Sequence, residues 1–184
     1  MKVFFDTEFS GLYKNTNLIS IGLISEDGKQ FYAEIEDEKL KNLDKWIEEN
    51  VLIHTVNYGD ALVLDIVNDE NDFYIGDKQS IAQELKEWFA QFDEVQLISD
   101  VCHYDMVLLI DLFGTAFDLP ENVCAACHDI NQDIAMYEHI TEQEAFDRNR
   151  EDFLLNHKIE VMGAKHNAMY DAKVIREIYR IIGE

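Results

Sequence analysis

Runs of apolar residues divide the chain into short strands and amphipathic helices. Strands are predicted where apolar and β-branched residues are bounded by polar or glycine-containing turns, at residues 1–8, 18–25, 30–35, 95–99 and 123–130. Glu26-Asp27-Gly28-Lys29 predicts a hairpin turn between the second and third strands. Gly22, inside the second strand, indicates a close approach of another segment or a bulge. The first three strands are therefore expected to be antiparallel in sequence order.

Apolar residues three and four positions apart predict the helices, at residues 39–50, 81–92, 106–113, 130–139, 142–156 and 169–182. Ser80 is the predicted N-cap of the second helix. The expected inward face of the first helix consists of Leu40, Leu43, Trp46 and Ile47. Residues 54–77 mix apolar pieces with Asn, Asp and Gly, and we interpret them as an insertion that carries one strand.

Three strands followed by alternating helices and strands predict an α/β domain around a mixed β-sheet. The chain has one proline, and we find no internal repeat, low-complexity tract or linker. Its 184 residues are enough for one well-buried core and short for two. A single domain over residues 1–184 is therefore expected.

Composition changes this picture mainly through charge. With 38 Asp and Glu residues against 15 Lys and Arg residues, the formal net charge is −23. This charge repels nucleic acid from most of the surface. A polyanionic substrate would therefore have to be held by metal ions and a local site rather than by a broad basic face.

The cysteine content and the absence of long apolar runs bear on the compartment. Three cysteines, an odd number, argue against a disulfide framework and favour a reducing cytoplasm. No run of about 18 apolar residues predicts a membrane span, and the first strand leaves no room for a secretory leader. The expected location is the cytoplasm, without a membrane partner.

Two carboxylates stand at the end of the first predicted strand, in Phe4-Phe5-Asp6-Thr7-Glu8. Because successive side chains of a strand alternate between faces, Asp6 and Glu8 project from the same side. Two like charges this close repel each other unless a cation lies between them. Carboxylate oxygens are ligands that Mg²⁺ and Mn²⁺ prefer. The pair is a candidate metal site, and a simple polar end of a strand is the alternative.

Further acidic residues complete a recognisable set. Asp105 stands at the start of one predicted helix, and His166-x-x-x-x-Asp171 stands at the start of the last. Together with Asp6-x-Glu8, these residues resemble the DEDD exonuclease superfamily, in its subclass with a catalytic histidine. The resemblance is closest to a group of bacterial and phage 3′-to-5′ exoribonucleases that includes the mycobacterial polyadenylate-specific exoribonuclease.

The resemblance spans most of the chain. It also rests on His103-Tyr104-Asp105-Met106-Val107 with Leu112-Phe113-Gly114, and on Lys165-His166-Asn167-Ala168-Met169-Tyr170-Asp171-Ala172. Residues 54–77 and 138–161 carry no motif of that group.

The resemblance implies a ribonuclease H-like fold and a metal-dependent exoribonuclease that releases nucleoside 5′-monophosphates from the 3′ ends of single-stranded RNA. It implies two Mg²⁺ or Mn²⁺ ions whose ligands are Asp6, Glu8, Asp105 and Asp171. It makes His166 the general base that takes the proton from the attacking water. Two such ions can activate water and neutralise charge at the attacking and leaving oxygens. Histidine suits a general base because its unperturbed pKa lies near neutral pH.

The resemblance also implies where the substrate binds, at Thr7, Phe9, Ser10, Gly11 and Leu12. In this superfamily the 3′-terminal nucleotide packs against the segment after the Asp-x-Glu strand. There an aromatic and an aliphatic side chain can stack on the base or wedge beneath it. A place in the core is the alternative for Phe9 and Leu12. Because related enzymes are often homodimers, a homodimer is also expected.

The lysines nearest the motifs are Lys14, Lys165 and Lys173. They are candidates for phosphate contacts, and solvated surface groups are the alternative.

Cys124-Ala125-Ala126-Cys127-His128 matches the haem-attachment pattern. With Cys102 and His103 it could instead supply zinc ligands. It lies in a predicted buried strand, where cysteine behaves as a small apolar residue, so we interpret it as a chance match.

Two other functions remain open. A DNA 3′-to-5′ exonuclease has the same motifs, because the choice between the two sugars depends on contacts to the 2′-hydroxyl. A catalytically silent, nuclease-like binding module is the other alternative. The presence of all five expected catalytic residues argues against it.

Overall fold

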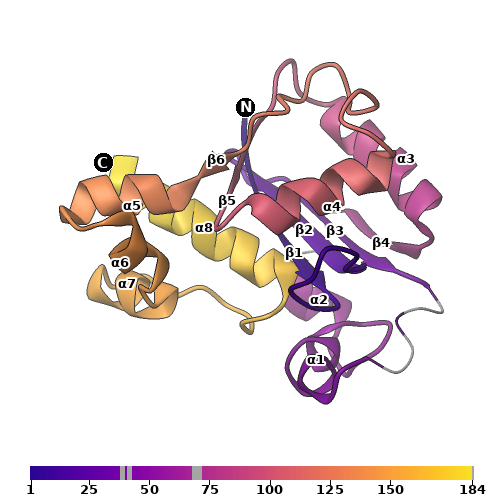
Figure 1. The fold of residues 1–184 in the computed structure, drawn as a ribbon, viewed down its shortest axis with the longest axis horizontal. Coiled ribbons are helices and arrows are strands. Elements are labelled where there is room, and N and C mark those ends of the chain that lie inside the picture. Colours follow the sequence, from indigo (N-terminus) through magenta and orange to yellow (C-terminus); the bar gives the residue numbers. More distant parts are fainter. Residues whose placement is uncertain (38–39, 41–42, 68–71, 184) are drawn as a thin grey trace.

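The computed structural model describes residues 1–37, 40, 43–67 and 72–183. Its centre is a six-stranded sheet in the order β4-β3-β2-β1-β5-β6, with helices on both faces (Figure 1). The strands are β1 (Lys2–Phe9), β2 (Leu18–Ser25), β3 (Gln30–Ile35), β4 (Asp72–Gly76), β5 (Gln96–Ser99) and β6 (His128–Asp129). The predicted α/β architecture around a mixed sheet is confirmed.

Strand pairing follows the predicted order. The β1–β2 and β2–β3 pairs are antiparallel, whereas β1–β5, β3–β4 and β5–β6 are parallel. The hairpin turn before Gln30 contains Gly28 at a φ of +96°, a conformation that favours glycine. Because β1 lies between β2 and β5, the strand with Asp6 and Glu8 is flanked by strands on both sides.

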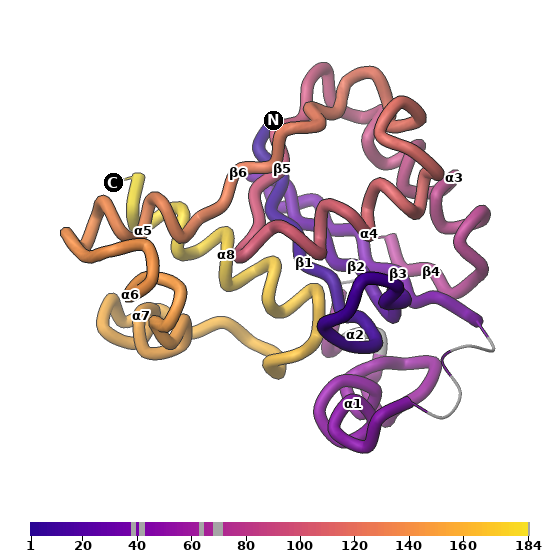
Figure 2. Tube along the Cα trace, viewed as in Figure 1, coloured from indigo at the N-terminus to yellow at the C-terminus, as the bar shows by residue number. Residues whose placement is uncertain are grey.

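The helices surround the sheet (Figures 1 and 2). They are α1 (Lys45–Asn50), the 3₁₀ turn η2 (Leu52–His54), α2 (Val63–Ile66), α3 (Lys78–Phe89), α4 (His103–Phe113), α5 (Ile130–Glu138), α6 (Glu142–Phe146), α7 (Arg150–Asn156) and α8 (Ala168–Gly183). α3 and α4 cover one face of the sheet, and α8 crosses the other. α5, α6 and α7 lie together beside α8, away from α3.

β1 contributes to a core on each face. Val3 and Phe5 pack with residues of α3 and α4, whereas Phe4 packs with residues of α8. This alternation follows from the period of two in a strand. Asp6 and Glu8 continue the row of Phe4, so they project towards α8.

Gly22 of β2 lies directly against the first turn of α8. A Cβ atom at this position would stand 2.4 Å from the backbone nitrogen of Met169 and 2.5 Å from the carbonyl oxygen of Ala168. The close approach predicted at Gly22 is therefore confirmed. It allows the start of α8 to sit on the sheet beside β1.

Substituting Gly22→Ala is expected to displace this first turn. Overpacking of this kind costs typically about 1–3 kcal/mol of unfolding free energy, which urea denaturation measures. The matched control is Gly76→Ala in β4, whose Cβ would meet Ser80 Cβ at an ordinary 3.5 Å. Equal losses for the two variants would contradict the close packing at Gly22.

The predicted helix 39–50 is shorter in the structure. It begins at Lys45, where Asp44 caps it by accepting a hydrogen bond from the Trp46 backbone nitrogen. Leu40 and Ile47 are buried as predicted, but Trp46 is 53% exposed. In a helix of only six residues, Ile47 alone is buried, and its neighbour Trp46 points to another side. Residues 39, 41 and 42 of the predicted helix lie outside the described residues.

Three other predicted elements are corrected. Asp77, not Ser80, caps α3, because the Asp77 side chain accepts from the Ser80 backbone nitrogen and the helix begins at Lys78. The strand predicted at 123–130 is reduced to β6, with an isolated bridge between Val95 and Val123. The helix predicted at 142–156 is two helices, because Asn149 accepts a hydrogen bond from the Asp152 nitrogen and so begins α7.

The insertion at 54–77 carries its predicted strand. This strand is β4, and it pairs with β3 in parallel register at the edge of the sheet. The insertion also contains α2, and its residues 68–71 lie outside the described residues.

Candidate active site

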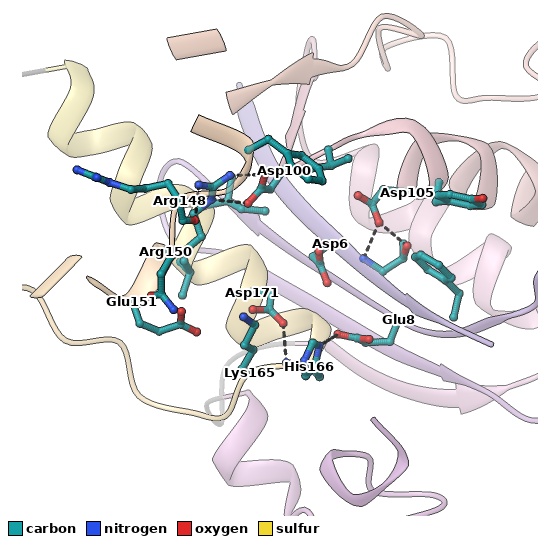
Figure 3. A pocket seen from close by; sticks show the side chains of 18 of the residues that line it. Asp6, Glu8, Asp100, Asp105, Arg148, Arg150, Glu151, Lys165, His166 and Asp171 are labelled. Carbon is teal, nitrogen blue, oxygen red and sulfur yellow. Dashed lines mark hydrogen bonds and ion pairs between the residues drawn. The ribbon is translucent and has the colours of Figure 1, made fainter. Parts of the chain in front are cut away.

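A pocket of about 510 Å³ opens where β1 ends, between the starts of α4 and α8 (Figure 3). All five predicted catalytic residues line it, namely Asp6, Glu8, Asp105, His166 and Asp171. Of the predicted substrate-binding residues, Thr7, Phe9 and Leu12 line it as well. Ser10 and Gly11 are not among its lining residues.

Three of the carboxylates form one cluster. Asp6 and Glu8 on β1 and Asp171 in the first turn of α8 each offer an oxygen, and these oxygens lie within 4.8 Å of one another. Burial raises the pKa values of Asp6 and Glu8 well above the usual range of carboxyl groups, and the neighbouring carboxylates raise both values further. Burial also raises the pKa of Asp171, to about 8, although the His166 backbone N–H opposes the shift. Three partly buried carboxylates that repel one another are a donor set for a divalent cation.

Asp105 belongs to the same pocket but lies on the α4 side of β1. Its Oδ1 accepts a hydrogen bond from the Thr7 backbone nitrogen at 3.1 Å and another from the Thr7 hydroxyl. Its Oδ2 accepts from the Ser99 hydroxyl at 2.7 Å. Burial raises the pKa of Asp105 to about 6, while the bonds from Thr7 and Ser99 lower it. These contacts tie the first turn of α4 to the ends of β1 and β5.

His166 occupies the turn before α8. Its φ is +64°, an uncommon left-handed conformation for a residue other than glycine. Its backbone nitrogen donates to Asp171 Oδ2 at 2.9 Å, and its Nδ1 lies 4.0 Å from Glu8 Oε1. Burial and the nearby Lys165 lower the pKa of the imidazole, which favours the neutral ring.

Two neighbours to which the sequence analysis gave no role at the site hold this turn in place. The Asn167 side chain accepts hydrogen bonds from the Met169 and Tyr170 backbone nitrogens and donates to the His54 carbonyl at 2.9 Å. Asn167 thus caps the start of α8, and Asn is a preferred capping residue, so a local signal was present. The exposed Trp46 meets the His166 ring edge-on, with ring centroids 5.3 Å apart. No local pattern indicates this contact, because it joins residues far apart in the sequence.

The end of β1 and the turn after it present two apolar side chains, Phe9 and Leu12. Phe9 stacks on Tyr104 of α4, with ring centroids 5.1 Å apart and an interplanar angle of 23°. Leu12 is 79% exposed. The Ser10 hydroxyl is buried and accepts from the Asn17 nitrogen at 2.9 Å, so it shapes the turn.

The opposite wall comes from the turn between α6 and α7 and from the first turn of α7. Arg148, Arg150 and Glu151 line the pocket there, together with Asp100 at the end of β5. The Arg150 guanidinium donates to both oxygens of Asp100, at 2.6 and 2.9 Å. The sequence carried no motif in this segment, and only the fold brings it to the site.

The lysines suggested for phosphate contacts have different surroundings. Lys165 lines the active-site pocket, and Lys14 lines a neighbouring pocket beside Tyr104. Lys173 faces a third pocket and donates to the Ile66 carbonyl at 2.8 Å. Of the three, only Lys165 stands beside the carboxylates.

The Cys-x-x-Cys-His segment does not form a cluster of ligands in the described residues. There, Asp6, Glu8 and Asp171 are the one group of three or more acidic, His or Cys side chains close enough to share an ion. Cys124 and Cys127 are free, and His128 Nε2 contacts Asp133. Across the same part of the chain, no helix has the length and apolar character that a membrane span requires.

Comparisons with known proteins agree with the geometry. A family model described as the 3'-5' exoribonuclease Rv2179c-like domain matches residues 1–182. Two curated 3'-5' exoribonucleases of Mycobacterium tuberculosis, MT2234.1 of strain CDC 1551 / Oshkosh and Rv2179c of strain ATCC 25618 / H37Rv, are similar to this chain. Each is 28% identical over 134 residues, which is 72% of this chain and 73% of the relative.

Solved nuclease structures share the fold. The nuclease domain of 3'hExo, a DEDDh family member bound to rAMP, superposes with a TM-score of 0.68 at 11% identity, covering 99% of this chain and 91% of that one. S. pombe Pop2p in its Mg²⁺- and Mn²⁺-bound form gives a TM-score of 0.63 at 16% identity, covering 98% and 82%. These likenesses confirm the predicted ribonuclease H-like α/β fold.

Proposed function

The chain belongs to the family of 3'-5' exoribonuclease Rv2179c-like domains, and on this basis we propose a metal-dependent enzyme that acts on single-stranded RNA. It removes nucleoside 5′-monophosphates from the 3′ end. The observation that carries the proposal is the cluster of Asp6, Glu8 and Asp171 oxygens within 4.8 Å of one another, with His166 beside it. The continuous sheet, covered by helices from both halves of the chain, supports one exonuclease domain over residues 1–184.

The carboxylates fit two divalent ions, Mg²⁺ or Mn²⁺. Their oxygens are the hard ligands that these ions prefer. Their pKa values are raised first by burial and then by neighbouring carboxylates, and a bound cation opposes both effects. Asp6, Glu8 and Asp171 would be direct ligands, and Asp105 would support one ion directly or through water. When bound, such ions activate water and neutralise charge on the attacking and leaving oxygens. The metal-bound Pop2p structure supports the same class of cofactor here.

The side chains of the chain itself supply the remaining steps. His166 takes the proton from the attacking water, because burial and Lys165 keep its imidazole neutral. Phe9, stacked on Tyr104, and the exposed Leu12 pack against the 3′-terminal base. Asp105 fixes the first turn of α4 against Thr7 and Ser99, so the pocket keeps its shape.

The test uses RNA and DNA oligonucleotides of one sequence, each labelled at either end, with Mn²⁺ or with EDTA. We expect stepwise shortening of 5′-labelled RNA and early release of a labelled mononucleotide from 3′-labelled RNA. EDTA should abolish both. Faster cleavage of DNA would favour a DNA exonuclease, and binding without cleavage would favour a silent binding module. Full activity in EDTA would exclude the metal-dependent mechanism.

Metal binding should also change the pH dependence of stability. The pKa of Asp171 is raised to about 8 and that of Asp105 to about 6 in the folded protein, above the unfolded value of 3.8. The folded state therefore binds protons more tightly, and the metal-free protein loses stability as pH rises from about 4 to 8. Added Mg²⁺ should offset this loss.

We expect the rise in melting temperature on adding Mg²⁺ to be larger at pH 8 than at pH 5.5. At a free concentration of about 100 times Kd, the ion adds about 2.7 kcal/mol. Differential scanning calorimetry at both pH values measures the effect. An equal rise at both pH values would contradict proton competition at these carboxylates.

A further inference from the structure

The segment from the last residue of α6 to the first turn of α7 forms a wall of the active-site pocket that the proposed mechanism does not use. Its lining residues fall between Phe146 and Glu151, whereas Phe9 ends β1 and Leu12 lies in the turn that follows. In Figure 3, Arg150 and Glu151 lie on the other side of Asp6 from Asp105. The pocket thus continues past the carboxylates, away from the place assigned to the terminal base.

This wall is rigidly built. Besides its two bonds to Asp100, the Arg150 guanidinium donates to Asn131 Oδ1 at 2.6 Å, to the Ala145 carbonyl at 2.7 Å and to the Arg148 carbonyl at 2.9 Å. Its side chain is only 13% exposed. Five hydrogen bonds from one largely buried guanidinium hold the turn against β5 and α5.

Phe146 presents an aromatic ring at this wall. It is the last residue of α6, whose buried residue is Ala145, and it is 52% exposed. It lines both the active-site pocket and the neighbouring pocket beside β6. An exposed ring beside a nuclease pocket is a surface on which a base can stack.

Glu151 presents a hydrogen-bond acceptor at the same wall. Its Oε2 is shielded from solvent, and no donor among the described residues reaches it. Buried polar atoms in proteins normally have a partner, so a ligand group is a reasonable donor. A ribose 2′-hydroxyl is such a donor, and it is the group that distinguishes RNA from DNA.

The charge of the wall suits a phosphate backbone despite this carboxylate. Lys165 lines the same pocket and forms no ion pair within the described part of the chain. Figure 3 places it next to Glu151 and Asp171. Its ammonium group offsets the negative charge of Glu151 where the RNA backbone would pass.

We infer that Phe146 and Glu151 form the subsite for the nucleotide on the 5′ side of the scissile phosphate. Phe146 stacks on the base of this penultimate nucleotide, and Glu151 accepts a hydrogen bond from its 2′-hydroxyl. The inference rests on the proposed function. If the terminal base lies against Phe9 and the scissile phosphate lies at the carboxylates, the strand must continue towards this wall.

The test compares three RNA oligonucleotides that differ only at the penultimate position: unmodified, 2′-deoxy, and abasic with the ribose retained. Wild type should prefer the unmodified RNA over the 2′-deoxy RNA by about 10- to 100-fold in kcat/KM, as for a hydrogen bond to a charged group. It should prefer unmodified over abasic RNA by about 10-fold or more.

The variants assign each preference to one side chain. Glu151→Ala should reduce the 2′-hydroxyl preference to within about threefold, while Glu151→Gln, which keeps an acceptor, should retain part of it. Phe146→Leu should reduce the preference for the base but not for the hydroxyl. The matched controls are Glu121→Ala and Phe117→Leu, at exposed positions outside the pocket, which should keep both preferences.

The outcomes separate this inference from the function on which it rests. Wild-type degradation of all three substrates at equal rates would overturn the subsite and leave the exonuclease intact. So would preferences that persist in both Glu151→Ala and Phe146→Leu, with folding verified by circular dichroism. Failure of wild type to cleave even unmodified RNA would overturn the proposed function and the subsite together.

Discussion

Replacing His166 by asparagine is expected to lower kcat by about 10²–10⁴-fold, the usual contribution of a general base. Affinity for Mn²⁺ should change little, because His166 is outside the cluster of Asp6, Glu8 and Asp171. Asparagine tolerates the left-handed backbone at this position, and its N–H can still donate to Asp171. Single-turnover kinetics and titration calorimetry with Mn²⁺ measure the two quantities.

The pH profile provides an independent check on this role. The pKa of His166 is lowered from 6.5, so wild-type activity should fall on the acidic side of that value, where the base becomes protonated. The variant should lack this limb of the profile. The matched control is His157→Asn, at an exposed position after α7. A variant that keeps wild-type kcat, or that loses Mn²⁺ binding with it, would contradict the assignment.

The sequence predicted those parts of the fold that local periodicity determines. β2 and β3 match their predicted ranges, and α8 extends its range by one residue at each end, because their apolar positions repeat with the period of a strand or a helix. The shared direction of Asp6 and Glu8 also followed from the period of a strand. The resemblance to the exonuclease family predicted that the distant Asp105 and Asp171 share a site with them, and the fold places all four residues in one pocket.

What escaped prediction depends on contacts between distant segments. Asp100 and Arg150 are 50 residues apart, and their ion pair makes one wall of the pocket without any local signature. The position of β4 at the sheet edge likewise depends on its pairing with β3. Glu34 is fully buried and accepts hydrogen bonds from the Val56 and Asn57 backbone nitrogens. These bonds fix the loop at residues 55–57, whose structure the hydrophobic pattern did not predict. A one-dimensional pattern reports which face of an element is buried, but not what covers it.

The second large effect is expected for Asp6→Asn. This substitution should lower kcat by about 10²–10³-fold or more, as the loss of one electrostatic group at an active site does. Affinity for Mn²⁺ should fall with it, because Asp6 is one of the three clustered carboxylates. The joint loss distinguishes Asp6 from His166, whose replacement should separate catalysis from metal binding.

In EDTA, the same substitution should make the protein more stable. Burial and the charges of Asp105, Asp171 and Glu8 raise the pKa of Asp6, so its ionised form is unfavourable in the folded state without metal. Asparagine has nearly the same shape and no charge, and it therefore relieves this repulsion. We expect the melting temperature in EDTA at pH 8 to rise above that of wild type, and the further rise on adding Mn²⁺ to shrink.

The gain in EDTA should vanish at low pH, where Asp6 is protonated in wild type and the two proteins carry the same charge at this position. Asp93→Asn, at an exposed site after α3, removes one negative charge from the surface and is the matched control for net charge. An Asp6→Asn variant less stable than wild type in EDTA at pH 8 would show that Asp6 stabilises the fold by itself. The expected gain would instead mean that the site is a source of instability in the metal-free protein, retained because the same carboxylates bind the ions needed for hydrolysis.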